Sequence, residues 1–268
     1  MSKKHQKYRR YLLTLICKEF RYNRKHKLSI THKLNVIEHV LRNGVSWLSL
    51  NKSNFKGDES SYRKFFYKLC NSNIFAKAIQ NFIITIPKQV YTDTTTIINK
   101  LGRLSDVAYC SKDKKHKGIK ISTYCDDNKF IYPSVITKGN VHDVKILEPT
   151  LAINLKPKIV VADKGYISSA LKLRLLNNGT ELIYPYRNYT RSNATTNTGT
   201  RRYNRAKYST NTDREKLMLK GRHRIENMFA TLKQYRRLNY VYDKNIKYFK
   251  GFVDLACYLI NSNVGYNG

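Results

Sequence analysis

The stretch QVYTDTTTII, residues 89–98, decides the fold class of this chain. It consists largely of β-branched and aromatic residues, which favour an extended strand. Before it, from about residue 29 to residue 86, apolar residues recur at helical spacing. After it, strand-like and helix-like segments alternate, which is typical of an α/β arrangement. The sequence therefore predicts an α/β region that begins near residue 87 and follows an all-helical region.

Downstream of residue 98, residues 118–125 (GIKISTYC) and 130–137 (FIYPSVIT) predict two strands joined by a tight turn at DDNK. Pro133 cannot donate to a β-ladder, so its strand is expected at a sheet edge. The remaining predicted elements are a helix at about 141–155, a buried strand at 158–163, a helix near 169–176, a strand at 180–186, a long helix at about 213–235 and a last helix at about 246–260.

Residues 1–86 are rich in lysine and arginine and follow helical patterns throughout. Ser29 and Thr31 can cap a helix that Gly44 would end, and further helices are expected around 61–69 and 75–84. Short basic helices favour a helix-turn-helix-like DNA-binding region, with a plain helical packing unit as the alternative. The expected organisation is a DNA-binding region at 1–86 and a catalytic domain at 87–268. That domain carries an exposed basic loop at 187–213.

The charge of the chain is its most informative bulk property. Fifty-one Lys and Arg against eighteen Asp and Glu give a formal net charge of +33, spread along the whole chain. Such a field predicts a polyanionic partner, with nucleic acid as the first choice. An AT-rich coding sequence would also inflate Lys, Asn, Ile and Tyr, but it does not explain the shortage of Asp.

Apolar runs and cysteines exclude several classes of protein. The longest apolar run, around 252–260, is interrupted by Asp254 and is too short for a membrane span, so no membrane partner is expected. The five cysteines are scattered without CxxC pairing, which predicts neither a zinc site nor disulfides and fits a reducing compartment. The expected location is the cytoplasm and nucleoid of a bacterium, or the nucleus or a viral factory for a eukaryotic or large-virus protein.

Three acidic residues occupy positions where an α/β sheet can place catalytic or ligand-binding side chains. Asp93 interrupts a strand of β-branched residues, where aspartate is rare. Asp163 ends the strand KIVVAD, and open sheets bind ligands at the carboxyl ends of their strands. Glu226 lies on the expected long helix, on one face with Arg222 and Lys233. The apolar stripe of the same helix, Ile225, Phe229 and Leu232, is expected to pack on the sheet.

Carboxylates from three separate elements can together bind two divalent cations, as metal-assisted phosphoryl transfer requires. An oxygen-only ligand set favours Mg²⁺ or Mn²⁺ over zinc. Each acid also has an ordinary interpretation: Asp93 as a strand-end residue, Asp163 as a turn former and Glu226 as the partner of Arg222 in a helical ion pair.

The pair His142-Asp143 follows the turn Gly139-Asn140, at a strand-to-helix junction. One interpretation is a site for a metal or a phosphate. The other is a helix terminus, with Asp143 in the first turn and Asn140 near the N-cap.

These motifs resemble those of DDE transposases of the bacterial insertion-sequence type. YTDTTTI (91–97) resembles the family's first-aspartate strand, and VVADKGY (160–166) resembles its D-x-G-Y block, which includes Tyr166. RHRIENMFATLK (222–233) resembles the Y-R-E-K glutamate helix: Arg222, Glu226 and Lys233 match, and Leu219 takes the place of the tyrosine. GIKISTYCDDN, GNVHD and LRNGVSWLSL also resemble family stretches, so the likeness covers about residues 33–262.

The resemblance implies an RNase H-like mixed sheet flanked by helices, with Asp93, Asp163 and Glu226 as catalytic metal ligands for two Mg²⁺ or Mn²⁺ ions. It implies that Arg222 and Lys233 contact DNA phosphates and gives His142, Asp143 and Tyr166 supporting roles. The implied partners are double-stranded DNA, both element ends and target, and a second copy of the chain on that DNA. A DNA-binding derivative without catalysis and an RNase H-like nuclease without strand transfer remain as alternatives.

Overall fold

A computed structural model describes residues 3–20, 28–52, 55–83, 86–105, 107–110, 115–151, 156–186 and 211–263. Most of the predicted basic loop at 187–213 lies outside these ranges. Within them, no helix is long and apolar enough to cross a membrane.

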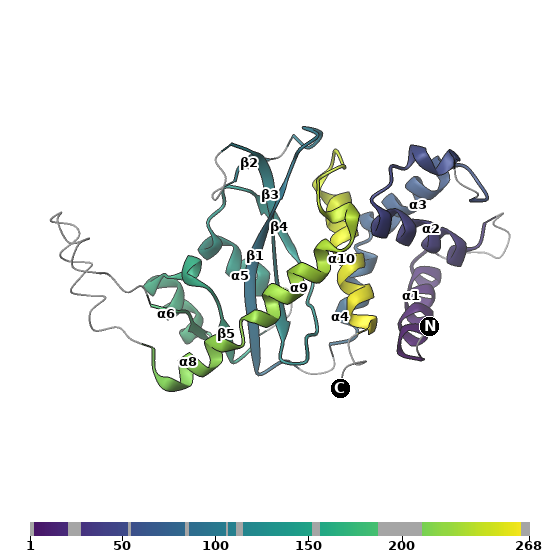
Figure 1. Ribbon diagram of the computed structural model, residues 1–268. Helices are drawn as coiled ribbons and strands as arrows, with labels where there is room; N and C mark the ends of the chain where they lie inside the picture. Colours follow the sequence, from purple (N-terminus) through teal and green to yellow (C-terminus); the bar gives the residue numbers. More distant parts are fainter. Residues whose placement is uncertain are drawn as a thin grey trace.

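A six-stranded mixed sheet forms the centre of the molecule (Figure 1). Its strand order is β2-β3-β1-β5-β6, and β4 pairs with the same edge of β3 as β2 does. β1 is antiparallel to β3 and parallel to β5, which is in turn parallel to β6. This mixed α/β sheet flanked by helices confirms the predicted fold class. The strands are β1 (Gln89–Ile98), β2 (Ala108–Tyr109), β3 (Lys117–Asp126), β4 (Val135–Lys138), β5 (Ile159–Val161) and β6 (Glu181–Ile183).

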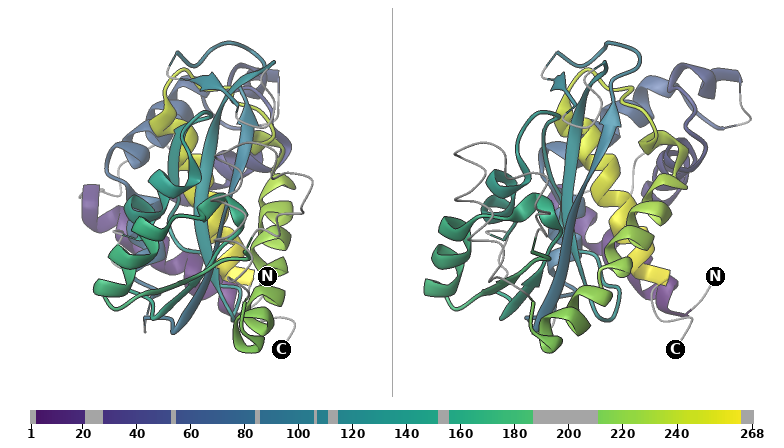
Figure 2. Two further views of the ribbon diagram at one scale, coloured as in Figure 1. Left: turned by 90° about the vertical axis from the view of Figure 1, so that its left-hand side faces the viewer. Right: turned by 60° about the vertical axis from the view of Figure 1, so that its left-hand side comes forward.

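Successive residues of the strands bury their side chains on opposite faces of the sheet, as the pleat requires. Val90 and Val160 belong to a cluster with residues of α5 and α6, while Tyr91 and Val161 belong to a larger cluster with α9 and α10. Figure 2 shows the sheet between these two helical layers. The helices on its faces are α5 (Asp143–Leu151), α6 (Ser169–Asn177), α8 (Asp213–Lys220), α9 (His223–Lys233) and α10 (Ile246–Asn263).

The N-terminal helices pack together and against α10. The predicted cap of α2 is confirmed: the Ser29 side chain accepts from the His32 amide at 3.2 Å, and Gly44 ends the helix at φ 68°. The large apolar cluster runs without interruption from α1 through α10 to one face of the sheet. These helices are α1 (Lys3–Phe20), α2 (Ile30–Asn43), α3 (Glu59–Asn71) and α4 (Ile74–Gln80).

Two predicted elements are wrong in extent. The strand expected at 130–137 is interrupted: Ile131 forms an isolated bridge to Cys125, and the continuous ladder is Val135–Lys138. The amide and the carbonyl of Ile131 bond instead to the Asn261 side chain of α10, each at 2.8 Å. The single long helix expected at 213–235 is two helices, α8 and α9, which meet at Gly221. A Cβ at Gly221 would lie 2.4 Å from the hydroxyl of Tyr91, so the chain passes β1 too closely for any larger residue.

Candidate active site

Asp93 and Asp163 lie at the same level of two neighbouring parallel strands. Tyr91 of β1 pairs with Val161 of β5, and each aspartate stands two residues further along its own strand. Asp93 is in the middle of β1, whereas β5 has already ended before Asp163. The carboxyl end of β5 therefore opens beside an aspartate of β1, which is the kind of position where an α/β sheet binds ligands.

Asp163 caps the short 3₁₀ turn Lys164–Tyr166, accepting from the Gly165 amide at 2.6 Å. Gly165 has no space for a side chain: a Cβ there would lie 2.8 Å from Asp163 Oδ1 and 2.8 Å from Asp143 Oδ2. The glycine of the D-x-G-Y block thus brings a second carboxylate, that of Asp143, next to Asp163.

Asp143 is in the first turn of α5, as predicted, but its carboxylate points toward the sheet. Oδ1 accepts from the Lys120 ammonium at 2.9 Å and from the Thr94 hydroxyl at 3.0 Å. His142 is exposed, and its Nδ1 lies 3.3 Å from the Val144 amide, at the start of α5. The two residues of the pair therefore have different positions, His142 at the helix terminus and Asp143 in the site.

Tyr166 is fully buried in the apolar cluster that the sheet forms with α5 and α6. Burial raises the pKa of its phenol well above the ordinary value, and the negative charges of Asp143, Asp93 and Asp163 raise it further. The phenol is therefore neutral at physiological pH. All three aspartates lie within electrostatic range of this one ring.

Glu226 is placed beside Asp93 by an arginine. Arg222 Nη2 lies 3.1 Å from Glu226 Oε1 and 3.5 Å from Asp93 Oδ2, so one nitrogen contacts both carboxylates. Asp93 also accepts from the Thr94 amide at 2.7 Å through its other oxygen. The Glu226 side chain is 57% exposed, which leaves it accessible from solvent. The expected ion pair of Glu226 with Arg222 is present, and it extends to the sheet.

The apolar stripe of α9 packs as predicted, with Ile225, Phe229 and Leu232 all buried against the sheet side. Lys233 is exposed at the end of the helix. Leu219, which stands in place of the family tyrosine, lies on α8 and is partly buried against the large apolar cluster. It contributes packing at that position and no polar group.

The donor set at this site fits a hard divalent cation, since carboxylate oxygens are the ligands that Mg²⁺ and Mn²⁺ prefer. The glycine at 165 leaves the space between two carboxylates free of a side chain. Within the described ranges, no three His, Cys, Asp or Glu side chains are close enough together to form a metal site as they stand. Binding an ion therefore requires small movements of the carboxylates, above all of Glu226, which is held by Arg222.

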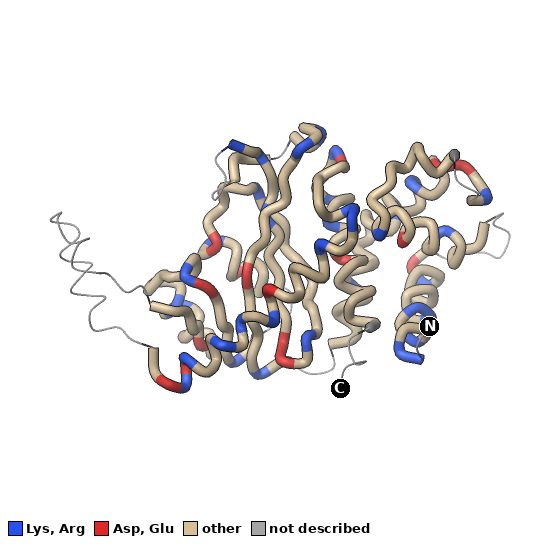
Figure 3. Tube along the Cα trace, in the orientation of Figure 1, with Lys and Arg blue, Asp and Glu red and all other residues tan. Residues whose placement is uncertain are grey.

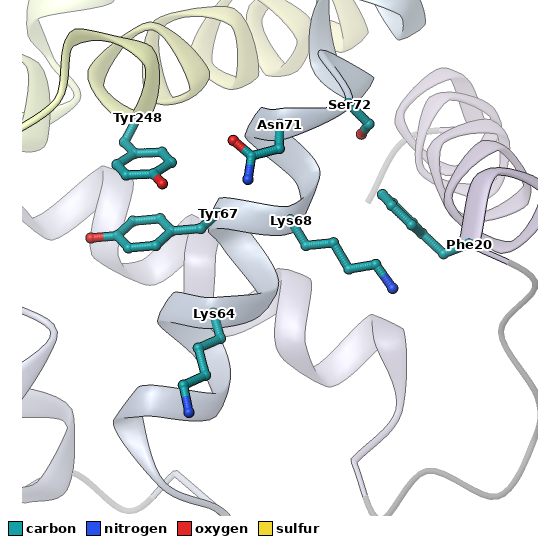
Figure 4. A pocket seen from close by; sticks show the side chains of 7 residues that line it. All are labelled: Phe20, Lys64, Tyr67, Lys68, Asn71, Ser72 and Tyr248. Atoms are coloured by element: carbon teal, nitrogen blue, oxygen red, sulfur yellow. The ribbon is translucent and has the colours of Figure 1, made fainter.

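A separate hollow lies between α1, α3 and α10 and is lined by aromatic and lysine side chains (Figure 4). Its rings are engaged with one another: Tyr67 stacks on Tyr248 at 3.7 Å, and Lys68 lies over Phe20 at 4.4 Å. None of the predicted acids lines this hollow. Lysine and arginine are distributed over the whole length of the described chain, with few acids among them (Figure 3).

Two residues of the site were not singled out from the sequence. Lys120 is 5% exposed, and Thr94 is the neighbour of Asp93 on the other face of β1. A signal for Lys120 was present, because it stands between two isoleucines in GIKIS, where a lysine is costly to bury. Thr94 is one of four threonines in its strand, and the sequence offers nothing to distinguish it.

The mixed sheet, with an aspartate on β1 beside the aspartate that follows β5, sets the class of this protein as an α/β protein with a candidate active site at its strand ends. Residues 90–248, more than half of the chain, match the transposase DDE domain family, and the chain belongs to that family. Membership implies the use of divalent metal ions in general. A comparison with curated proteins gives no sequence match.

Among solved structures, the chain is similar to a piggyBac transposase synaptic complex with hairpin DNA, at 12% identity and a TM-score of 0.41. That match covers 99% of this chain and 66% of that chain, so the protein spans slightly less than two thirds of the piggyBac length. A Mos1 transposase paired-end complex matches at 8% identity and a TM-score of 0.28, covering 82% of this chain and 83% of that one. A Mos1 strand transfer complex matches at 8% identity and a TM-score of 0.27, covering 82% of each chain.

Proposed function

We propose that this protein is a transposase that cuts DNA at the ends of a mobile element and joins those ends to target DNA by phosphoryl transfer. The observation that carries the proposal is the placement of Asp93 and Asp163 on adjacent parallel strands, with Glu226 linked to Asp93 through Arg222. Family membership supports the reaction class, and the charge of +33 supports DNA as the substrate.

In this proposal Asp93, Asp163 and Glu226 hold two Mg²⁺ or Mn²⁺ ions, which supply Lewis-acid polarisation of the scissile phosphate. The Gly165 amide orients Asp163, and Arg222 balances the charge of Asp93 and Glu226. Tyr166, fully buried at the end of the turn that Asp163 caps, supports that turn. Lys233, exposed at the end of α9, contacts a DNA phosphate.

The proposal includes a second copy of the chain. An element has two ends, and one site of this kind processes one end at a time, so a homodimer on DNA places one active site at each end. Light scattering of the protein with a terminal duplex is expected to give a mass of two chains. A single chain per end throughout the reaction would remove the dimer from the proposal.

The test of the reaction is an assay of the full chain with Mn²⁺ and a labelled duplex carrying the terminal sequence, taken from inverted repeats that flank the gene. Joined products establish transposition. Products that are cut but never joined indicate an RNase H-like nuclease instead. DNA binding with no products at all indicates a derivative without catalysis.

The residues are tested by Asp93→Asn, Asp163→Asn and Glu226→Gln. Each is expected to abolish cleavage and leave DNA binding nearly unchanged, because the amide keeps the shape of the carboxylate and loses its charge. Glu148→Gln is the control, since Glu148 is an acid of α5 that pairs with Arg174 on the surface. A variant that retains substantial cleavage excludes its residue from the catalytic set.

A further inference from the structure

Tyr91 stands two residues before Asp93 in β1, and both side chains project to the face of the sheet that α9 covers (Figure 1). The pleat of a strand sends alternate residues to the same face, about 6.6 Å apart along the strand. β1 therefore offers α9 two successive points of contact. At one of them Arg222 contacts both Asp93 and Glu226. The other is formed by Tyr91.

The ring of Tyr91 packs on the junction between α8 and α9. The residue is 2% exposed, and a Cβ at Gly221 would lie 2.4, 2.5 and 2.6 Å from three of its atoms. The guanidinium of Arg224, in the first turn of α9, lies over the same ring at 5.2 Å from its centroid. Arg224 also donates to the Gly221 carbonyl at 3.4 Å, so it links the ring to the junction.

The hydroxyl of Tyr91 connects this junction to the turn after β3. It donates to Asp127 Oδ1 at 2.8 Å and accepts from the Gln89 side-chain amide at 2.6 Å. Arg224 Nη1 lies 3.4 Å from the same hydroxyl, and Nη2 lies 3.9 Å from Asp127. Segments far apart in the sequence thus meet at one phenolic oxygen. The residues that meet there form the Tyr91 cluster: Gln89, Tyr91, Asp127 and Arg224.

A helix that contacts a strand at one point can pivot about it, whereas two points fix both its rotation and its position along the strand. The side chain of Glu226 is 57% exposed, so its position depends on the placement of the helix that carries it. The apolar stripe of α9 supplies burial, which is not directional. The hydrogen bonds of the Tyr91 cluster are directional, and they act at the start of the same helix.

We propose that Tyr91 is a positioning residue for the proposed reaction. Its cluster fixes the start of α9, and this placement sets Glu226 beside Asp93. The inference rests on the proposed function, because it takes Glu226 as part of the active site. Catalytic groups have to be held within about 0.5 Å of their working geometry, and a displacement of about 1 Å can cost on the order of 100-fold in rate. A change at buried Tyr91 is therefore expected to slow the reaction without weakening DNA binding.

Tyr91→Phe tests this role, because it removes the hydroxyl and keeps the ring that packs on Gly221. The full chain is given Mn²⁺ and a saturating amount of terminal duplex, and single-turnover cleavage is compared with duplex affinity. The cleavage rate is expected to fall about tenfold or more, with the affinity unchanged. Thermal unfolding verifies that the variant is folded.

Tyr132→Phe is the matched control. Tyr132 is also 2% exposed, and its hydroxyl donates to the Asp126 carboxylate at 3.2 Å. It belongs to the apolar cluster with α5 and α6, on the face of the sheet away from α9. The two variants lose the same kind of hydrogen bond, so a general loss of stability would slow both. Only Tyr91→Phe is expected to cleave more slowly than the parent.

Two further variants test the partners of the hydroxyl. Asp127→Asn combined with Tyr91→Phe is expected to be no slower than the slower single variant, because both changes break one hydrogen bond. Arg224→Lys keeps the charge and loses the planar group over the ring, so it is expected to cleave more slowly than the parent. Parental cleavage in Arg224→Lys, with a salt slope reduced by about one unit in Arg224→Ala, would overturn the role of Arg224 and assign it to a DNA phosphate.

Hydrogen exchange separates the failure of this inference from the failure of the proposed function. Faster exchange at the start of α9 in Tyr91→Phe, with α5 unchanged, is expected whether or not the chain cleaves DNA. Cleavage by Tyr91→Phe at the parental rate would overturn the positioning role and leave the proposed function intact. A parent chain that never cleaves would overturn the proposed function. The exchange result would then still decide whether the Tyr91 cluster fixes the start of α9.

Discussion

Asp93 and Asp163 owe their positions to their own strands: Asp93 lies within β1, and Asp163 follows the end of β5, two residues ahead of a glycine. The position of Asp143 was not predictable from its own segment. Whether it capped α5 or entered the site depends on Lys120, which lies 23 residues away in sequence and contacts it only after β3 and α5 have packed.

Arg222 also acquires its partners from the tertiary structure. Its pairing with Glu226 follows from helical spacing, but its contact with Asp93 at 3.5 Å spans 129 positions of the chain. The family resemblance implies that Arg222 contacts a DNA phosphate. Both carboxylates compete with that phosphate for the guanidinium of Arg222. Lys233 has a different position, exposed at the end of α9.

The phosphate contacts of these two residues are tested by the salt dependence of DNA-end binding. Lys233→Ala is expected to reduce the slope of log affinity against log salt by about one unit, as loss of one phosphate contact does. Arg222→Ala is expected to do the same and to impair end processing. Lys145→Ala, an exposed lysine of α5, is the control for loss of one charge. An Arg222→Ala protein with an unchanged slope and intact cleavage would show that this guanidinium serves only the carboxylates.

The presence of a helix or strand was easier to predict from the sequence than the residues at which it begins and ends. β1 and α2 match their predicted positions because each is specified locally, β1 by its β-branched run and α2 by a serine cap and a glycine end. The break between α8 and α9 was missed because Gly221 sits inside an otherwise helical pattern. At this break Gly221 packs against the ring of Tyr91, which lies in β1, more than a hundred residues earlier in the chain.

Gly221→Ala tests how closely the chain passes Tyr91 at this break. The new methyl group would lie 2.4 to 2.6 Å from three atoms of Tyr91, and φ at this position is −68°, so any cost comes from the collision and not from backbone strain. Overpacking of this kind is expected to lower the free energy of unfolding by about 1–3 kcal/mol. Thermal or urea unfolding measures the change.

Lys220→Ala, at the exposed last residue of α8, is the matched control and is expected to change stability by less than about 0.5 kcal/mol. Equal stability of Gly221→Ala and the parent would mean that the ring of Tyr91 does not require a glycine at this position.

In the molecule as a whole, α10 connects the two regions that the sequence separates. It packs on α1, α3 and α4 and also contacts β4 and α9. The Tyr258 hydroxyl donates to the Tyr8 carbonyl at 2.7 Å, and Phe252 stacks on Phe66 at 4.1 Å. A pattern of helical periodicity assigns each helix an apolar face but cannot say which distant helix covers it. A fragment of residues 1–86 would leave these faces uncovered, so DNA recognition by this region has to be tested in the full chain.

The N-terminal region provides a defined basic surface for that test. On α1 the apolar residues Tyr8, Leu12 and Ile16 are buried, and Lys3, Lys7 and Arg10 form an exposed stripe at helical spacing on another face. Arg9 is not part of this stripe, because it pairs with Glu38 at 3.6 Å.

We predict that this stripe contributes to recognition of the element ends, separately from catalysis. The full chain with Lys7→Ala and Arg10→Ala is expected to lose preference for the terminal duplex over a scrambled duplex at moderate salt, because short basic helices suit the major groove. The control is Lys145→Ala with Lys158→Ala, which removes two exposed charges from the catalytic region. With a net charge of +33 every variant will bind DNA at low salt, so only the ratio of the two affinities is informative. An unchanged ratio in the α1 variant would place recognition elsewhere, and residues 187–213 would be the next segment to mutate.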